Sequence, residues 1–334
     1  MRFIYALIVI VFISCGKDTS NPNYVSGNAF GTTYNIQYYS SSDFDVEEGL
    51  DSVFYAVNKS VSTYMPSSDI SKINHGDSTI IVDAIFKEVY NISEMVYTNS
   101  KGYFDPTIGV LRNAYGFGDS KPLAQIDSLT LDSLMQYVGF QKVELLSNGS
   151  ITKEHPEIYF DFNAVAKGYG IDQIGKYLEG QGVEHYLIEL GGELLTKGEN
   201  LAKNQNWIAG IESVDSSLED RSISAKVSLT NVGMASSGNY RKFRIDSITG
   251  KKYVHTINPL TGKAEQSDVT SATVIAPTCA LADAYATAFM AMGLERSVTL
   301  IKELDDIHAY LTYSNSSKLT ETFISEGFKK YLVD

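Results

Sequence analysis

The stretch Asp161-Phe162-Asn163-Ala164-Val165-Ala166-Lys167-Gly168-Tyr169-Gly170 is the most informative part of this sequence. Residues 158–162 are mostly β-forming and residues 164–178 have helical spacing, so a strand is predicted to run directly into a helix. The N-terminal end of a helix presents free backbone N–H groups and a partial positive charge, which suit a phosphate group. Lys167 would add a full positive charge there, and Asp161 would end the strand. The pattern indicates an anion site, although an ordinary helix start with a solvated lysine would look the same.

The elements on either side of this stretch predict an α+β fold, with mixed or antiparallel sheets and packed helices. Strands and helices interleave without a regular βαβ period, and neither a GxGxxG nor a Walker motif occurs, which disfavours Rossmann and P-loop sites. Residues 213–224 are acidic and serine-rich, as in a solvated loop. The strands are predicted at 30–39, 143–146, 158–162, 186–190, 207–212, 227–229 and 269–275. The helices are predicted at 46–60, 129–138, 164–178 and 280–292, and one more helix is predicted to follow a cap at Asp83.

The charge balance excludes one large class of partner. The 334 residues carry 27 basic and 40 acidic side chains, a formal charge of −13, and the sequence has no run of Lys or Arg. A nucleic-acid-binding protein normally carries a basic patch, so nucleic acid is not expected as a partner. An anionic ligand would need a local positive site against this background.

The N-terminus has the pattern of an exported lipoprotein. Arg2 precedes an apolar run over residues 3–13, too short for a membrane-spanning helix of about 20 residues, and the run ends at Ser14-Cys15. We expect residues 1–14 to be a signal peptide, Cys15 to be lipidated, and residues 15–23 to form a tether to a folded unit at 24–334. An ordinary signal peptide is the alternative. If Cys15 is acylated, Cys279 has no cysteine left for an intramolecular disulfide.

A second candidate site lies in Ala282-Asp283-Ala284-Tyr285-Ala286-Thr287. Asp283 and Thr287 are four residues apart on a predicted helix, so their side chains share one face. A carboxylate and a hydroxyl are hard oxygen ligands of the kind that Mg²⁺ accepts, usually with water and substrate phosphate. The alternative is that Asp283 caps or pairs while Thr287 packs.

Other segments contribute a histidine, an arginine and several aromatic rings. His255, in the segment 255–262, precedes a Pro/Gly turn and would suit a general base, and Arg241 ends the segment 237–241. Tyr64, the segment 102–109 and the segment 113–118 place aromatic rings beside glycines, which suits stacking on a flavin or an adenine. Structural histidines and aromatic core packing are the ordinary explanations of such residues.

Taken in order, these segments resemble the ApbE family of FAD:protein FMN transferases. The resemblance runs from about Phe30 to the C-terminus. It rests on Gly31–Tyr34, Ser62–Tyr64 with Ser68–Asn74, Gly102–Gly109, Asn113–Gly118, Asp161–Gly170, Glu189–Glu193, Ser237–Arg241, His255–Gly262 and Ala282–Thr287. Lipoprotein anchoring also occurs in this family, in agreement with Cys15.

The resemblance implies a bilobed, T-fold-like α+β architecture with FAD in a cleft between the lobes. Mg²⁺ would be held by Asp283, Thr287 and the backbone carbonyl of Ala164. His255 would accept a proton and Arg241 would balance phosphate charge. The residues that would contact FAD are Phe30, Tyr64, Tyr103, Phe104, Asp105, Asp161, Lys167 and Ile257.

The implied activity is Mg²⁺-dependent transfer of FMN from FAD to a threonine hydroxyl of a partner protein, with release of AMP. Acceptors of the Rnf type or the NADH:quinone reductase type would meet the enzyme at the extracytoplasmic face of the cell membrane. The segment Asp268–Thr273 resembles an acceptor motif without its glycine, and we interpret it as a core strand. An FAD pyrophosphatase and a non-catalytic flavin-binding lipoprotein remain alternatives.

Overall fold

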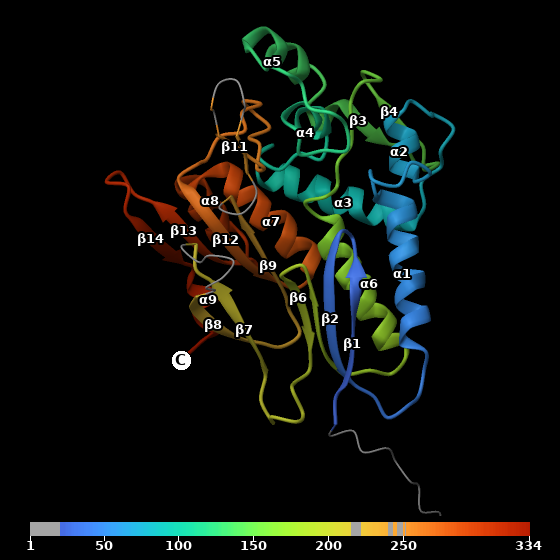
Figure 1. Ribbon diagram of the computed structural model, residues 1–334, viewed down its shortest axis with the longest axis vertical. Helices are drawn as coiled ribbons and strands as arrows, with labels where there is room; N and C mark the ends of the chain where they lie inside the picture. The colour runs from blue at the N-terminus through green and yellow to red at the C-terminus, as the bar shows by residue number, and fades with distance from the viewer. Residues whose placement is uncertain (1–20, 215–221, 240–242, 246–249, 251) are drawn as a thin grey trace, which may run out of the picture.

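The computed structural model describes residues 21–214, 222–239, 243–245, 250 and 252–334, and its largest sheet is antiparallel throughout. This sheet pairs strands that lie far apart in the sequence; Ile36, for example, is opposite Ile188. The α+β prediction is confirmed. The eight strands, in spatial order, are β1 (Asn23–Ala29), β2 (Thr32–Tyr39), β5 (His185–Leu190), β6 (Glu193–Lys197), β9 (Gly233–Gly238), β12 (Val269–Ala276), β13 (His308–Ser314) and β14 (Thr320–Ile324) (Figure 1).

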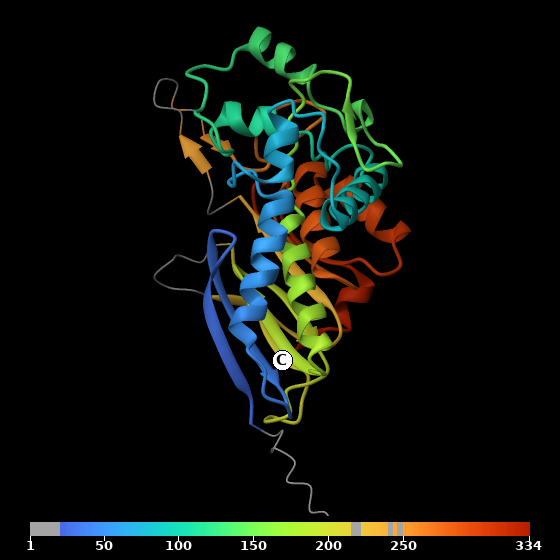
Figure 2. The ribbon, with the colours of Figure 1, turned by 90° about the vertical axis from the view of Figure 1, so that its right-hand side faces the viewer.

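Helices cover one face of this sheet (Figures 1 and 2). The two helices nearest the sheet are α6 (Ala166–Gly180) and α7 (Cys279–Met292), which also contact each other. Helices α1 (Val46–Val61) and α3 (Ala84–Asn99) pack outside them. The remaining helices are α2 (Asp69–Asn74), α4 (Gly109–Tyr115), α5 (Ser128–Met135), α8 (Leu294–Glu303), α9 (Glu326–Lys329) and the short 3-10 turn Phe140–Lys142.

Helix α7 is the central helix of the core. Thr278 caps it, accepting a 3.3 Å hydrogen bond from the Leu281 N–H, and its alanines alternate with larger apolar residues so that nearly every side chain is buried. A helix that is apolar all round belongs inside a protein, which explains why the sequence predicted its position well. Asp283 is the one charged residue of this helix, and burial of a carboxylate in such surroundings needs a specific partner.

A smaller sheet packs on the opposite face of the large sheet. It has the order β15 (Leu332–Val333), β8 (Ile223–Leu229) and β7 (Trp207–Glu212), and its apolar side chains meet those of β9, β12 and β13. Two hairpins, β3 (Val143–Leu145) with β4 (Ile151–Lys153), and β10 (Phe243–Ile245) with β11 (Lys252–Val254), lie toward the upper end of Figure 1. Residues 223–224 belong to β8, so the predicted loop at 213–224 was too long.

The predicted strand at 158–162 was wrong. The segment is extended and largely buried, but its pairing in the described chain is limited to a bridge between Tyr159 and Ile108. The side chain of Asn74 replaces a neighbouring strand, since its Nδ2 donates to the Phe160 carbonyl and its Oδ1 accepts from the Phe160 N–H, both at 2.8 Å. Residues 163–165 then form a turn, so helix α6 begins at Ala166 rather than at Ala164.

Strand β1 was missed because its pairing partner decides its structure. Residues 23–29 contain glycine and asparagines, and they form a strand through pairing with β2. The turn between the strands holds Phe30 at φ 49° and Gly31 at φ 76°, so the predicted strand at 30–39 begins at Thr32. The predicted helices at 46–60, after Asp83 and at 280–292 are confirmed, as are the strands at 186–190, 207–212 and 269–275.

The N-terminal predictions concern residues that are mostly outside the described part of the chain. The expected signal peptide at 1–14, Cys15 and most of the expected tether lie there, whereas Asn23 is the first residue of β1. Within the described ranges, the structure contains no helix of sufficient length and apolarity to span a membrane.

Candidate active site

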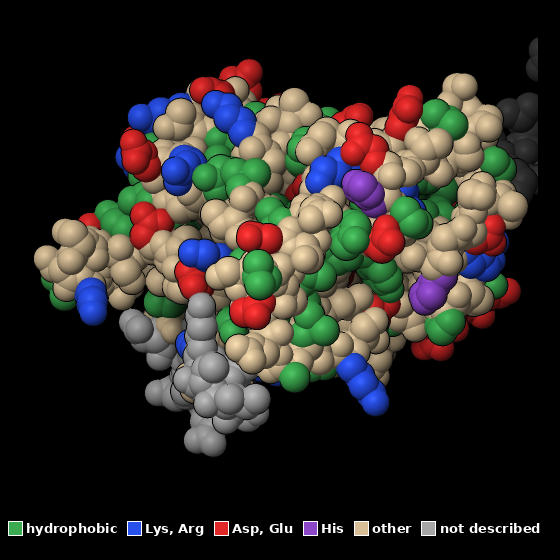
Figure 3. Space-filling view, turned by 90° about the horizontal axis from the view of Figure 1, so that it is seen from above, with side chains coloured by type: hydrophobic (Ala, Val, Ile, Leu, Met, Phe, Trp, Pro, Cys, Tyr) green, Lys and Arg blue, Asp and Glu red, His purple; other side chains and the backbone are tan. Residues whose placement is uncertain are grey.

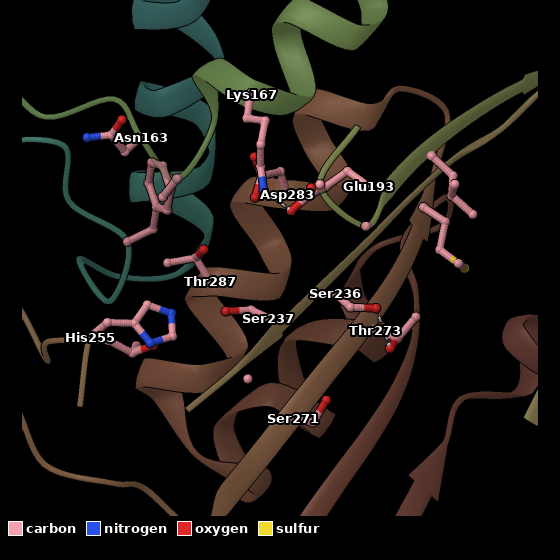
Figure 4. A pocket seen from close by; sticks show the side chains of 18 of the residues that line it. Asn163, Lys167, Glu193, Ser236, Ser237, His255, Ser271, Thr273, Asp283 and Thr287 are labelled. Carbon is pink, nitrogen blue, oxygen red and sulfur yellow. Dashed lines mark hydrogen bonds and ion pairs between the residues drawn. The ribbon is translucent and has the colours of Figure 1, made fainter. Parts of the chain in front are cut away.

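A cavity lies where the first turn of α6, the β5–β6 turn, strands β9 and β12, and helix α7 come together (Figure 4). Its volume is about 680 Å³, within the range of sites that hold cofactors and other organic ligands. Residues 103–108 and 255–259 form a further part of its wall. Of the predicted site residues, Tyr103, Phe104, Asp105, Asp161, Ala164, Lys167, His255, Ile257, Asp283 and Thr287 line this cavity.

A lysine and two buried carboxyl groups meet at one end of the cavity. Lys167 from α6 forms an ion pair with Oε1 of Glu193, the first residue of β6, and Asp283 from α7 points to the same place (Figure 4). The exposed fractions of Glu193 and Asp283 are 4% and 8%. Two acids this deeply buried require a cation beside them, and Lys167 supplies one positive charge for the two groups.

The electrostatics of this cluster follow from burial. Burial acts to lower the pKa of Lys167, but the Glu193 and Asp283 carboxylates outweigh it, so the lysine pKa is raised and the side chain stays charged. Burial raises the pKa of Glu193, with Lys167 opposing the rise and Asp283 adding to it. Burial also raises the pKa of Asp283, opposed by Lys167 and by the Gly168 N–H. The site therefore favours binding of additional positive charge.

The close contact between α6 and α7 requires glycine at position 168. A Cβ at Gly168 would lie 2.4 Å from the Cys279 carbonyl oxygen and 2.9 Å from the Cα of Ala280, both rigid backbone atoms. Because the helices approach so closely, the Gly168 N–H donates a 3.2 Å hydrogen bond to Oδ2 of Asp283. The glycine of the informative stretch thus positions a candidate metal ligand.

The donor set at this end of the cavity suits a divalent cation that prefers oxygen. No group of three or more His, Cys, Asp or Glu side chains with metal-binding geometry occurs in the described residues. Asp283, Thr287 and Ala164 line the same cavity. The buried Oε2 of Glu193 has no hydrogen-bond partner among the described residues, and an orphaned carboxylate oxygen of this kind is suited to a cation.

His255 and a group of hydroxyls form another wall of the cavity. His255 follows β11 directly, and Thr287 and Ser237 lie between it and the Lys167–Glu193 pair in the view of Figure 4. Further in, the hydroxyls of Ser236 on β9 and Thr273 on β12 are 2.8 Å apart. Thr273 is buried in β12, so the interpretation of Asp268–Thr273 as a core strand holds from Val269 onward, whereas Asp268 is exposed and precedes the strand.

Asp161 is held in place by a residue that sequence reasoning missed. Nη1 of Arg112, from α4, donates a 2.9 Å hydrogen bond to Oδ1 of Asp161, which also accepts from the Asn163 N–H at 2.9 Å. The hydroxyl of Tyr64 lies near the same guanidinium. The nearest signal in the sequence was the position of Arg112 directly before the aromatic segment 113–118.

The Asp105 carboxylate is hydrogen-bonded to neighbouring residues that support this wall of the cavity. Oδ1 accepts hydrogen bonds from the N–H and the hydroxyl of Thr107, at 2.8 and 2.6 Å, and Oδ2 accepts from the Phe140 N–H at 3.1 Å. Burial raises the pKa of Asp105 to about 6, although these hydrogen bonds oppose the rise. In this structure both carboxylate oxygens shape the loop that carries Tyr103 and Phe104.

Three predicted site residues are not among those that line the cavity. In the described part of the chain, Phe30 packs edge-on against Phe54 at 5.5 Å and lies over Gly170, and Tyr64 is largely exposed beside Arg112. Arg241 lies outside the described residues.

Glu193 is the most important residue that the sequence did not single out. It is the last residue of the motif 189–193. A signal was present, because a lone acid directly follows Gly191 and Gly192 and directly precedes two leucines at the start of a strand. Both glycines have positive φ, 62° and 101°, so they make the tight turn that aims Glu193 into the cavity.

The upper face of the molecule has no field of a single charge. Acidic and basic side chains are interspersed across it, with hydrophobic side chains between them (Figure 3). An anionic ligand would therefore depend on local groups such as Lys167 rather than on long-range attraction.

Comparison with known proteins gives consistent matches along most of the chain. Residues 30–311 match the model of the ApbE family. The FAD:protein FMN transferase of Haemophilus influenzae is 31% identical over 331 residues, which are 95% of this chain and 93% of that protein. The FAD:protein FMN transferase of Vibrio cholerae is 29% identical over 338 residues, 99% of each chain. A solved structure, the flavin transferase ApbE from Vibrio cholerae, has a TM-score of 0.82 and 29% identity, covering 93% of this chain and 99% of that one.

Proposed function

The chain belongs to the ApbE family, and from this premise we propose that it transfers the FMN moiety of FAD to a protein. The relatives that bear the name FAD:protein FMN transferase match it over nearly their whole length. The observation that carries the proposal is the convergence of Lys167, Glu193 and Asp283 in a cavity whose wall also holds His255.

The residues of the cavity have distinct roles in this reaction. Lys167 would lie against the pyrophosphate of FAD, and the aromatic and apolar side chains of Tyr103, Phe104 and Ile257 would hold a ring of the dinucleotide. The acceptor is a threonine hydroxyl of a partner protein, whose oxygen attacks the FMN-side phosphorus. The new P–O bond replaces the bond to AMP, which leaves, while His255 accepts the threonine proton.

Asp283, Thr287 and the carbonyl of Ala164 would hold Mg²⁺. The chemistry that the ion supplies when bound is neutralisation of negative charge on the pyrophosphate. The protein's own contribution is positioning, because the buried cluster is fixed by the α6–α7 contact and by the β5–β6 turn before any ligand arrives.

The decisive experiment combines purified protein, FAD, Mg²⁺ and a candidate acceptor that carries a threonine motif. We expect covalent flavin fluorescence on the acceptor in a denaturing gel, with AMP released in equal amount. FMN in place of FAD should give no product, because FMN has no AMP to lose. Free FMN with AMP and an unlabelled acceptor would indicate a pyrophosphatase, and absence of AMP would indicate a flavin-binding protein without turnover.

We also propose that the enzyme works while anchored to the extracytoplasmic face of the cell membrane through lipidated Cys15. The support is the sequence pattern at residues 2–15, and membrane electron-transport subunits of the Rnf or NADH:quinone reductase type would be the acceptors within reach. Cys15→Ser should move the protein from the membrane fraction to the soluble fraction and abolish labelling by radioactive palmitate. Retention of label in this variant would refute the anchor at Cys15.

A further inference from the structure

We propose that Glu193 is itself a ligand of the divalent cation, giving the metal site a second carboxylate beside Asp283. This inference rests on the proposed function and names a ligand beyond Asp283, Thr287 and the Ala164 carbonyl. The geometry consists of three elements that bring their side chains to one point: α6 with Lys167, β6 with Glu193 and α7 with Asp283 (Figure 4).

The two carboxylate oxygens of Glu193 are in different environments. Oε1 is engaged by the Lys167 ammonium, whereas Oε2 is buried and has no hydrogen-bond partner in the described part of the chain. The side chain is only 6% exposed, so Oε2 is largely withdrawn from the open solvent. Leaving a buried carboxylate oxygen unpaired costs free energy unless the group has a further partner, and a cation at this point would be that partner.

The charges of the Lys167, Glu193 and Asp283 cluster are not balanced. Glu193 and Asp283, when ionised, carry two negative charges, and Lys167 offsets only one of them. Hydrogen bonding to Asp283 comes from the neutral Gly168 N–H, which adds no full charge. A divalent cation between the two carboxylates would change the net charge of the cluster from −1 to +1, which suits a pyrophosphate that carries negative charge.

Glu193 is held rigidly by the sheet. It is the first residue of β6 and pairs with Leu190 at the closed end of the β5–β6 hairpin, next to the two positive-φ glycines. Its position is therefore set by the sheet rather than by a flexible loop. A ligand mounted on a strand and facing a helix keeps its geometry when the metal is absent.

A matched control exists in the same two elements. Lys197 of β6 and Glu179 of α6 form a second Lys–Glu ion pair of 2.7 Å, with both side chains more than a third exposed. Glu179→Gln therefore removes a carboxylate from the same helix–strand pair without touching the cavity.

The test measures Mn²⁺ binding to the whole chain without FAD, from the electron paramagnetic resonance signal of free Mn²⁺. The variants are Glu193→Gln, Asp283→Asn, Lys167→Met and Glu179→Gln, each checked for folding by near-ultraviolet circular dichroism. We expect Glu193→Gln to weaken Mn²⁺ binding by about tenfold or more, as loss of a ligand or of its supporting group does. Glu179→Gln should bind as the wild type does, and Lys167→Met should bind at least as tightly, because it loses a competing positive charge.

Each contrary result has a separate meaning. Glu193→Gln with unchanged affinity, while Asp283→Asn loses binding, would overturn the role of Glu193 and leave the proposed function intact. Equal weakening in Lys167→Met and Glu193→Gln would also overturn it, since Glu193 would then act only by holding the lysine. A wild type that takes up no Mn²⁺ would overturn this inference together with the metal part of the proposed function.

Discussion

The backbone N–H of Gly168, in the first turn of α6, donates a 3.2 Å hydrogen bond to Oδ2 of Asp283 in α7. This bond connects the stretch that predicted an anion site with the helix that predicted a metal site. It exists because the backbones of the two helices approach more closely than any side chain at position 168 would allow. The parts of the cavity that are proposed to hold the pyrophosphate and the metal are therefore connected by a direct hydrogen bond.

Gly168→Ala should break this link. The new Cβ would lie 2.4 Å from a backbone carbonyl oxygen, so α6 and α7 must separate, and overpacking of this kind typically costs about 1–3 kcal/mol. Urea unfolding would measure the loss, and Mn²⁺ binding should weaken as Asp283 moves. Gly180→Ala is the control, because a Cβ there meets nothing within 4 Å, and it should leave stability equal or higher by about 0.4–1 kcal/mol. Equal stability of the two variants would contradict the tight contact.

Asp172 should make the stability of the protein depend on pH. Its carboxylate accepts hydrogen bonds from the Cys279 N–H, at 2.8 Å, and the Ala280 N–H, at 2.9 Å, at the start of α7. Burial raises its pKa from 3.8 to about 7, although these hydrogen bonds oppose the rise. The folded state therefore binds the proton more tightly than the unfolded state does. This contribution to stability is present at low pH and is lost as the pH rises from about 4 to 7.

Asp172→Asn should accordingly show a smaller fall in the free energy of unfolding between pH 4.5 and pH 7.5, measured by urea titration at each pH. Asp127→Asn is the control, since Asp127 is an exposed cap whose pKa is lowered, chiefly by hydrogen bonds from Thr130. Its contribution is complete above about pH 4, so this variant should keep the wild-type slope. Parallel curves for wild type and Asp172→Asn would exclude Asp172 as the source.

The sequence predicted well those parts of the fold whose structure is decided locally. The Asp83 cap was confirmed, with its side chain accepting from the Phe86 N–H at 2.9 Å, and the apolar helix at 280–292 was confirmed within one residue. Strand β1 and the segment 158–162 were mispredicted because residues outside each segment decide their structure. Strand β1 depends on β2, and 158–162 is completed by the side chain of Asn74 rather than by a strand.

In the site, too, the residues that local sequence patterns indicate differ from those that only contacts in the folded chain indicate. Ten of the predicted residues line one cavity. The sequence could predict them because the family resemblance ordered their motifs along the chain. Arg112 and Glu193 were missed because their importance depends on contacts with Asp161 and Lys167, 49 and 26 residues away in the sequence. Neither pair has a local pattern, so only the folded chain shows that these charges meet.

Lys167→Met should weaken FAD binding, and urea unfolding should also show a loss of stability, because two buried carboxyl groups lose their cation. Loss of a charge-assisted contact to phosphate costs about 1.5–3 kcal/mol, equivalent to a rise in Kd of about tenfold or more. Quenching of flavin fluorescence at low salt would measure Kd for FAD. Lys197→Met, which removes the exposed lysine of the pair with Glu179, should bind FAD as the wild type does. An unchanged Kd in Lys167→Met would place the pyrophosphate elsewhere in the cavity.

His255→Ala should separate binding from chemistry. His255 lines the cavity on the wall formed by residues 255–259, apart from the Lys167–Glu193 pair, so its loss should leave Kd for FAD within about twofold. If it accepts the proton of the attacking threonine, the rate of acceptor labelling at saturating FAD should fall by about 10²–10⁴-fold, the usual contribution of a general base. His155→Ala is the matched control, because His155 is exposed and packs edge-on against Tyr137, and it should label the acceptor at the wild-type rate. A His255→Ala variant that labels the acceptor normally would remove the histidine from the mechanism, and one that loses FAD binding would make it a binding residue instead.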